Sequence, residues 1–203
     1  MNSVFNQNMR LGKFEFMAMN NPLRRWSQKH VEFKIFKDQL NKAGIELKGK
    51  AIMDGGCGSG YSTGLIVSEF HPSRIEAFDF MPEQIALAKK RNLKVDFAVG
   101  DLTKIDAADG SFDAVFIFGV LHHIPEWTEA LRQIARVLKP GGVLLVEEPR
   151  YRFNWNDFES GIGQAGFEIV DMTKYFAWDF RAYLCRKTVL QGLSNSKPTN
   201  QRQ

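Results

Sequence analysis

The sequence is poor in the features that mark exported, membrane-spanning and zinc-binding proteins. It contains only two cysteines, Cys57 and Cys185, too few for a disulfide framework or a four-cysteine zinc site. Its longest unbroken apolar run, Ala114–Leu121 with Gly119 included, has eight residues, whereas about 20 are needed to cross a bilayer. Met1–Lys13 lacks the apolar core of a signal peptide. We therefore expect no metal site, no membrane span and a reduced, cytoplasmic location.

Positive charge is concentrated in the first quarter of the chain. Residues 1–50 contain ten Lys or Arg and four Asp or Glu, whereas residues 51–203 contain 17 and 19. The net charges of the two parts are therefore +6 and −2, which give the +4 of the whole chain. Such an excess could attract an anionic substrate or nucleic acid, or it could be the solvated face of a surface helix, the interpretation we favour.

Hydrophobic periodicity predicts one long amphipathic helix, followed by alternating strands and helices. Asn21 and Pro22 supply an N-cap and a first-turn proline, and Gly44 ends the helix. Its stripe recurs at spacings of three, four and seven residues: Trp26, His30, Phe33, Leu40 and Ala43. The predicted strands cover residues 51–53, 74–78, 95–99, 112–118, 143–146, 167–172 and 180–185. The predicted helices cover residues 61–70, 82–91, 127–138 and 156–165.

This alternation indicates an α/β fold with a mostly parallel seven-stranded sheet, because parallel neighbours need crossovers and helices then cover both faces. We expect the last strand to be antiparallel. Residues 1–48 are predicted to form a helical lid, residues 49–187 the sheet domain, and residues 188–203 a flexible tail. Ligands of such sheets bind beyond the carboxyl ends of the strands, near the point where the strand order reverses.

A glycine-rich loop follows the first predicted strand. Asp54 ends the strand, and Gly55–Tyr61 reads Gly-Gly-Cys-Gly-Ser-Gly-Tyr. Glycines let the backbone approach a ligand closely, and the helix that follows presents free N–H groups. A phosphate-binding GxxxxGK[ST] loop is excluded because no lysine lies between Lys50 and Lys89, and the dinucleotide pattern GxGxxG fails at Thr63. An acidic residue beneath the loop disfavours a diphosphate and suits a ligand that carries an ammonium group.

The segments at successive strand ends resemble the class I S-adenosylmethionine-dependent methyltransferases, in particular the small-molecule branch that includes quinone C-methyltransferases. The likeness rests on Asp54, Gly56, Gly58 and Gly60, then Asp79-Phe80-Met81, Gly100-Asp101-Leu102, Phe112-Asp113, Phe118–His123 and Leu138–Gly142. It spans roughly residues 50–148. Each motif alone is only suggestive, but together, in this order and at strand ends, they are specific. The resemblance implies a Rossmann-like fold with helices on both faces and S-adenosylmethionine as cofactor.

The resemblance also implies which residues bind the cofactor. They are Asp54, Gly56, Gly58, Gly60, Tyr61, Asp79, Phe80, Met81, Asp101, Leu102, Phe118 and Gly119. Asp79 would accept hydrogen bonds from the ribose hydroxyls, and Asp101 would bind the adenine edge. Plainer roles stay open: a surface turn for Asp79, a helix N-cap for Asp101, and a brace of the loop for Asp54. Cys57 is interpreted as a small loop filler, because no base adjoins it in the sequence.

Methyl transfer asks the enzyme mainly to align the acceptor and exclude water, and a base is needed only if the acceptor loses a proton. His122 and His123 are the candidate catalytic residues, since histidine titrates in the useful range; they could also only shape their loop. Tyr61 and Glu147 are weaker candidates. The candidate walls of an acceptor pocket are Phe14, Phe16, Arg24, Arg25 and Trp26.

The predicted function is methyl transfer to a small-molecule acceptor. The alternatives are a methyltransferase of RNA or other nucleic acid, a noncatalytic cofactor-binding partner subunit, and an NAD-dependent dehydrogenase. Phe118–Leu121 argues against methylation of exocyclic base amines, because enzymes of that type resemble one another in carrying an acidic or amide residue, two prolines and an aromatic residue there. No Pro-Cys pair is available for cytosine C5 chemistry. The sequence makes no prediction about the oligomeric state.

Overall fold

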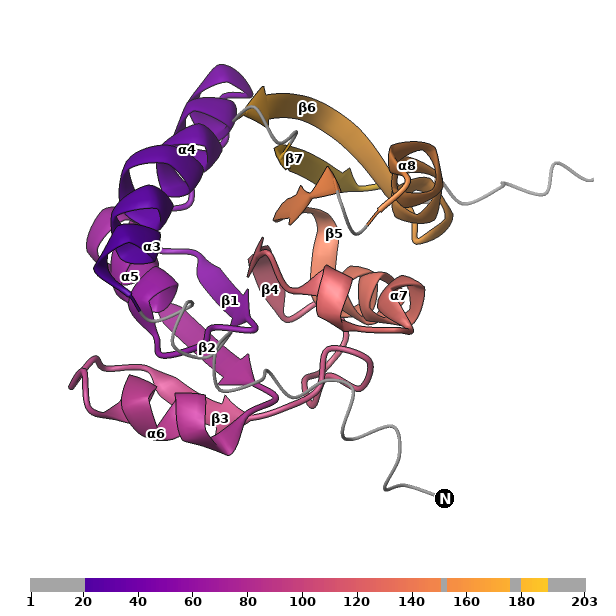
Figure 1. The fold of residues 1–203 in the computed structure, drawn as a ribbon. Helices are drawn as coiled ribbons and strands as arrows, with labels where there is room; N and C mark the ends of the chain where they lie inside the picture. Colours follow the sequence, from indigo (N-terminus) through magenta and orange to yellow (C-terminus); the bar gives the residue numbers. More distant parts are fainter. Residues whose placement is uncertain (1–20, 151–152, 176–179, 190–203) are drawn as a thin grey trace, which may run out of the picture.

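A seven-stranded sheet forms the centre of the molecule (Figure 1). In the computed structural model, which describes residues 21–150, 153–175 and 180–189, the strand order is β3-β2-β1-β4-β5-β7-β6. The strands are β1 (Ala51–Gly55), β2 (Arg74–Asp79), β3 (Asp96–Val99), β4 (Phe112–Phe118), β5 (Leu138–Pro149), β6 (Phe167–Tyr175) and β7 (Phe180–Lys187). Strands β1 to β5 pair in parallel, and β7 is antiparallel to both of its neighbours. The predicted α/β sheet with an antiparallel last strand is confirmed.

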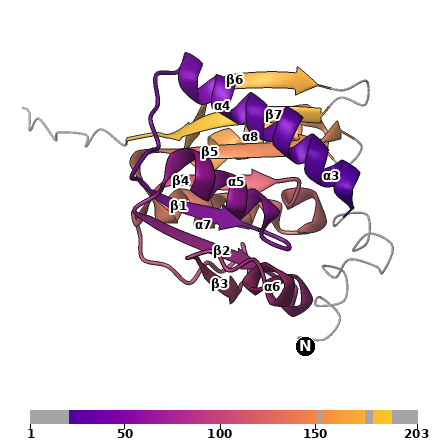
Figure 2. The ribbon, with the colours of Figure 1, turned by 90° about the vertical axis from the view of Figure 1, so that its left-hand side faces the viewer.

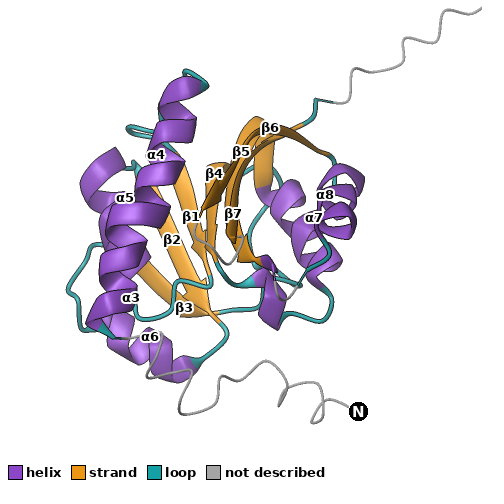
Figure 3. Ribbon diagram, turned by 45° about the horizontal axis from the view of Figure 1, so that its top comes forward, coloured by secondary structure: helices purple, strands orange, loops and turns teal. Residues whose placement is uncertain are grey.

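Helices cover both faces of this sheet (Figure 3). One face carries α3 (Pro22–Ser27), the π-helix η1 (Gln28–Glu32), α4 (Phe33–Lys42), α5 (Tyr61–Phe70) and α6 (Pro82–Lys89). The other carries α7 (Trp127–Val137) and α8 (Trp155–Gln164), and a 3₁₀ turn, η2 (Leu121–His123), follows β4. Most predicted boundaries hold within a few residues. Leu138 is an exception: predicted to end a helix, it begins β5 and pairs with Phe112 before a shift in register.

Alternating side chains of the central strands enter two hydrophobic clusters. Ile52 and Phe116 point toward the cluster that contains α4 and α5 side chains, whereas Val115 and Ile117 point toward the cluster of α7 and α8. All four are fully buried. Strands buried on both faces read as continuous apolar runs, which is why the run in β4 stands out in the sequence.

The N-terminal helix is one rod with a wide turn inside it (Figure 2). The Asn21 side chain accepts a hydrogen bond from the Arg24 amide and caps its start. The amide of Phe33 donates to the carbonyl of Gln28, five residues back, which defines a π-turn. Beyond this turn Phe33 is buried, whereas Trp26 before it is 56% exposed. The prediction of a single α-helical stripe that includes Trp26 is therefore wrong.

Phe14 and Phe16 lie outside the described residues, as do residues 190–203 of the predicted tail. Within the described ranges, no helix combines the length and apolar character needed to cross a membrane.

Candidate functional site

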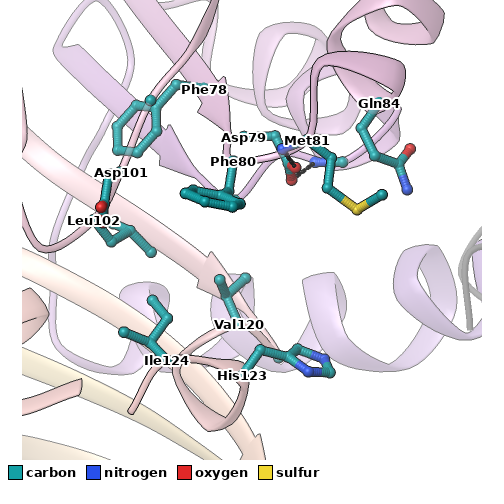
Figure 4. A pocket seen from close by; sticks show the side chains of 14 residues that line it. Phe78, Asp79, Phe80, Met81, Gln84, Asp101, Leu102, Val120, His123 and Ile124 are labelled. Atoms are coloured by element: carbon teal, nitrogen blue, oxygen red, sulfur yellow. Dashed lines mark hydrogen bonds between the residues drawn. The ribbon is translucent and has the colours of Figure 1, made fainter. Parts of the chain in front are cut away.

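A pocket lies at the carboxyl ends of four neighbouring strands, β3, β2, β1 and β4 (Figure 4). The last residues of β2 and the loops after the four strands line it. They supply Gly56 and Gly58, then Phe78–Met81, then Gly100–Leu102, and finally residues between Gly119 and Ile124. The pocket encloses about 680 Å³, its open mouth included, which is within the range of small-molecule sites. The strand order reverses between β1 and β4, so the pocket lies where ligands of this fold class bind.

The glycine loop is tied to the neighbouring strand ends through its backbone. The amide of Gly56 donates to the carbonyl of Phe78 at 2.8 Å. Gly56 has a φ of +72°, and a Cβ there would come within 2.5 Å of a Val120 methyl group. Both the conformation and the close approach therefore require glycine at this position. At Gly58, by contrast, a Cβ would meet nothing within 4 Å, so the backbone there is open toward the pocket.

Asp79 braces the glycine loop and also faces the pocket. Its Oδ2 accepts a hydrogen bond from the Gly58 amide at 2.9 Å, and its Oδ1 accepts one from the Met81 amide at 2.8 Å. Burial raises the pKa of this carboxyl group, and the two amides oppose that shift. Figure 4 shows the Asp79 side chain beside Met81 and opposite Val120. Asp79 therefore lines the pocket while each of its oxygens already accepts one backbone hydrogen bond.

Asp101 also lines the pocket. Its Oδ1 accepts hydrogen bonds from the amide and the hydroxyl of Thr103, each at 2.8 Å. These bonds cap a short turn between Asp101 and Lys104, and no helix begins there. The N-cap interpretation is therefore wrong, and one carboxylate oxygen is committed to the turn.

Asp54 lies beneath the loop and does not line the pocket. Its Oδ2 accepts hydrogen bonds from the hydroxyls of Ser62 at 2.8 Å and Thr63 at 2.6 Å, both in the first turn of α5. Burial raises the pKa of Asp54 to about 6, and the two hydroxyls limit the shift. Asp54 therefore braces the start of α5, as the plainer interpretation expects, but through hydroxyl groups.

Three other predicted cofactor residues lie next to the pocket without lining it. Gly60 is the N-cap of α5 and has a φ of +73°. Two guanidinium groups lie over the Tyr61 ring, that of Arg25 at 5.8 Å and that of Arg91 at 5.5 Å from its centroid. Phe118 is buried in the core, where its ring centroid lies 5.1 Å from that of Phe36. These residues support the loop and the sheet.

The two histidines after β4 have different surroundings. His123 lines the pocket (Figure 4). His122 contacts a buried glutamate instead, with 2.6 Å between its Nδ1 and Oε2 of Glu148. The two rings lie 3.9 Å apart. Only His123 is placed to meet a ligand in the pocket, and sequence reasoning had not singled out Glu148.

Other pocket residues were also missed: Phe78, Gln84, Gly100, Val120 and Ile124. Gly100, Val120 and Ile124 lie in or beside segments already recognised at strand ends, so a wider window would have included them. Phe78 gave no separate signal, because its aromatic ring fits a buried strand equally well. Gln84 lies one helical turn after Met81, where α6 passes the pocket.

Arg24 is engaged by carboxylates and does not offer a free positive charge. Its Nη1 lies 2.6 Å from an oxygen of Glu32, and its Nη2 lies 3.7 Å from Oε1 of Glu147. The Tyr175 hydroxyl donates to the other oxygen of Glu147 at 2.6 Å. Burial holds the pKa of Glu147 well above its usual range. The cluster joins the N-terminal helix to β5 and β6, so the expectation that Arg24 meets an anionic acceptor loses its support.

Cys57 is buried in the glycine loop, and burial raises the pKa of its thiol far above the usual value. A thiol that stays protonated is a poor nucleophile, which agrees with its interpretation as a loop filler. Among the described residues, no group of three His, Cys, Asp or Glu side chains could hold a metal ion.

Comparison with known proteins finds similarity to methyltransferases. Residues 53–146 match the family described as "Methyltransferase domain". A fatty-acid O-methyltransferase of Mycolicibacterium smegmatis is 27% identical over 145 residues, which are 66% of this chain and 53% of that protein. A ubiquinone biosynthesis O-methyltransferase of Xanthomonas oryzae is 35% identical over 112 residues, 51% of this chain and 45% of that protein. The chain thus spans about half the length of these relatives.

Solved structures agree on the fold. An S-adenosylmethionine-dependent methyltransferase from Aquifex aeolicus has a TM-score of 0.72 at 18% identity and covers 87% of this chain and 99% of its own. The resemblance to class I methyltransferases predicted from the sequence is confirmed.

Proposed function

We propose that this chain is an S-adenosylmethionine-dependent methyltransferase that acts on a small-molecule acceptor. One observation carries the proposal: a glycine loop without a phosphate-binding lysine and two carboxylates, Asp79 and Asp101, line the same pocket. Acidic groups suit a ligand with hydroxyl and amino donors and disfavour a diphosphate. The names of the relatives support the same class of reaction.

The residues present fit the cofactor. Asp79 would accept hydrogen bonds from the ribose hydroxyls, and Asp101 with the backbone at Leu102 would hold the adenine edge. The open backbone at Gly58 would accommodate the methionine part. When bound, the cofactor supplies a methyl group on a positively charged sulfur, a carbon open to in-line displacement. The side chains of the pocket would orient the reactants and exclude water.

A direct test is the affinity of the Asp79→Ala variant for S-adenosylmethionine and S-adenosylhomocysteine, measured by calorimetry. Charge-assisted hydrogen bonds contribute about 1.5–3 kcal/mol each, so we expect binding to weaken at least about tenfold. Asp38→Ala is the control, because Asp38 lies on α4 in an exposed pair with Lys34. Unchanged affinity of a folded Asp79 variant, or binding of a nicotinamide dinucleotide by the wild type, would contradict the proposal.

A second experiment, a screen of candidate acceptors, identifies the molecule that is methylated. The relatives' names direct the first panel to fatty acids and to hydroxylated precursors of quinones, and formation of S-adenosylhomocysteine reports transfer. If the wild type binds the cofactor tightly but transfers methyl to no member of a broad panel, the noncatalytic partner subunit becomes the better proposal.

Further assignments belong to this proposal. His123 is the candidate base for an acceptor that loses a proton, because it lines the pocket. Residues 1–48 are proposed as the acceptor lid, because Arg25 near the start of the N-terminal helix lies over the ring of Tyr61, the residue that follows the glycine loop. The tail and the cytoplasmic location remain predictions from the sequence.

A further inference from the structure

The segment after β4 supplies four of the residues that line the pocket: Gly119, Val120, His123 and Ile124. It contains only the three-residue 3₁₀ turn η2, so its own backbone hydrogen bonds are few. Val120 also packs against Gly56, where a Cβ would come within 2.5 Å of it. The position of this segment therefore determines where one wall of the pocket lies and how closely Val120 packs against the glycine loop.

Glu148, near the end of β5, accepts hydrogen bonds from the backbone of this segment. Its Oε1 accepts hydrogen bonds from the amides of Val120 at 3.0 Å and Leu121 at 2.7 Å. Its Oε2 accepts one from the amide of His122 at 3.4 Å and lies 2.6 Å from Nδ1 of the same residue. Three successive amides therefore converge on the oxygens of one carboxyl group, in the concave arrangement of a backbone nest.

The Glu148 carboxyl group is fully buried. Burial raises its pKa to about 8, although all three amides oppose that shift. Burying a carboxyl group is costly unless its hydrogen bonds are made. The cost is offset by the hydrogen bonds to the segment after β4.

We propose that Glu148 is a positioning residue of the cofactor pocket. It fixes the segment after β4 so that Val120 and His123 face the bound cofactor. Through Val120 it also determines how closely the glycine loop packs against this segment. This inference rests on the proposed function and names a residue that acts through its neighbours without touching the ligand.

The test compares Glu148→Gln with Glu148→Leu. Glutamine keeps an oxygen for the amides of Val120 and Leu121. Its NH₂ group can donate to Nδ1 of His122, and only the long contact with the His122 amide, at 3.4 Å, is lost. Leucine has a similar volume and no acceptor. We expect the affinity for S-adenosylhomocysteine to stay within about threefold in the Gln variant and to fall at least about tenfold in the Leu variant.

Hydrogen exchange of the ligand-free proteins gives a second readout. We expect faster exchange in the Leu variant at the amides of residues 119–124, with β1 and β2 unchanged. Glu159→Leu is the matched control, because Glu159 on α8 accepts hydrogen bonds from Arg181 and Tyr183 and does not line the pocket. Its affinity for S-adenosylhomocysteine should stay within about twofold of wild type.

Wild-type affinity in a folded Leu variant, or faster exchange spread evenly over the sheet, would overturn the proposal. If the Leu variant does not fold, Glu148→Asp replaces it, because the shorter side chain withdraws both oxygens from the amides. Weaker ligand binding by this variant supports the proposal, and unchanged binding refutes it. If the wild type fails to bind S-adenosylhomocysteine, the proposed function falls, and the exchange experiment still tests whether Glu148 holds the segment.

Discussion

At the scale of single residues, buried carboxyl groups hold the site together. Asp54, Asp79 and Glu148 each lie at or near the end of a parallel strand. Asp79 and Glu148 accept hydrogen bonds from loop amides, and Asp54 accepts them from hydroxyls in the first turn of α5. Burial raises the pKa of all three. The hydrogen bonds that these carboxyl groups accept hold the surrounding backbone and also affect the pKa of each group. The geometry of the site and the protonation of its carboxyl groups are therefore linked.

Asp54 gives this linkage a measurable form. Its pKa of about 6 in the folded protein lies above the ordinary 3.8, so the folded state binds the proton more tightly than the unfolded chain. Protonated Asp54 makes its full contribution to the free energy of unfolding below about pH 4. This contribution, up to about 3 kcal/mol, is lost as the pH rises through about 6. We expect Asp54→Asn, which cannot ionise, to lack this loss.

Urea unfolding of both proteins between pH 4 and pH 7 checks this expectation. The difference between the two free energies of unfolding isolates Asp54 from the other groups that titrate. Two curves that run parallel over this range would show that Asp54 does not have the raised pKa.

Sequence reasoning located most of this site for a physical reason. Residues such as Asp79 and Gly56 follow strands directly, and the carboxyl ends of parallel strands meet at one edge. It placed Phe118 and Tyr61 in the site as well, although the side chains of a strand alternate between faces and Phe118 points into the core. It missed Glu148, because the partners of that residue lie 26 to 28 positions away.

At the scale of elements, the N-terminal helix is built into the core of the sheet domain. The Phe36 ring meets those of Phe116 and Phe118. The Gln39 side chain donates to the carbonyl of Ala182 on β7 at 2.9 Å. A predicted lid segment therefore contributes part of the hydrophobic interior.

Phe36→Ala tests the contribution of this helix to stability. Phe36 is fully buried, and removal of a buried aromatic side chain costs about 3–5 kcal/mol. Trp26→Ala on the same rod is the control, because the exposed indole should change the free energy of unfolding by no more than about 0.5 kcal/mol. Chemical denaturation measures both. Equal losses in the two variants would mean that the rod is held by something other than the Phe36 cluster.

The wide turn in this helix could not be predicted. Residues of the turn, such as Val31 and Glu32, have ordinary helical propensities, and a π-turn depends on tertiary contacts. Here Glu32 turns inward to meet Arg24. A prediction from apolar spacing assumes the same number of residues in every helical turn, and for this reason it placed Trp26 in the buried stripe.

At the scale of the whole molecule, the positive charge of the first quarter is largely paired on the described helix. Lys34 pairs with Asp38, Lys37 with Glu69 and Lys42 with Asp171. These lysines bind acidic groups on the protein itself, including α5 and β6. The arrangement favours a solvated helix face over a surface for nucleic acid.

We accordingly expect no retained complex in a gel shift of roughly 1 μM protein with mixed RNA at about 150 mM salt. The measurement is repeated at low salt to separate weak general attraction from specific binding. Tight binding with a steep dependence on salt would revive the nucleic-acid alternative.

The π-turn at Gln28–Glu32 also affects how this chain is compared with others. One additional residue in a helix rotates everything before it by roughly 100° relative to an uninterrupted one. An alignment that counts back from Phe33 without a gap would therefore superpose the wrong side chains upstream of the turn. A residue of another protein should be paired with Arg24 by the direction in which its side chain points, not by its number of residues before Phe33.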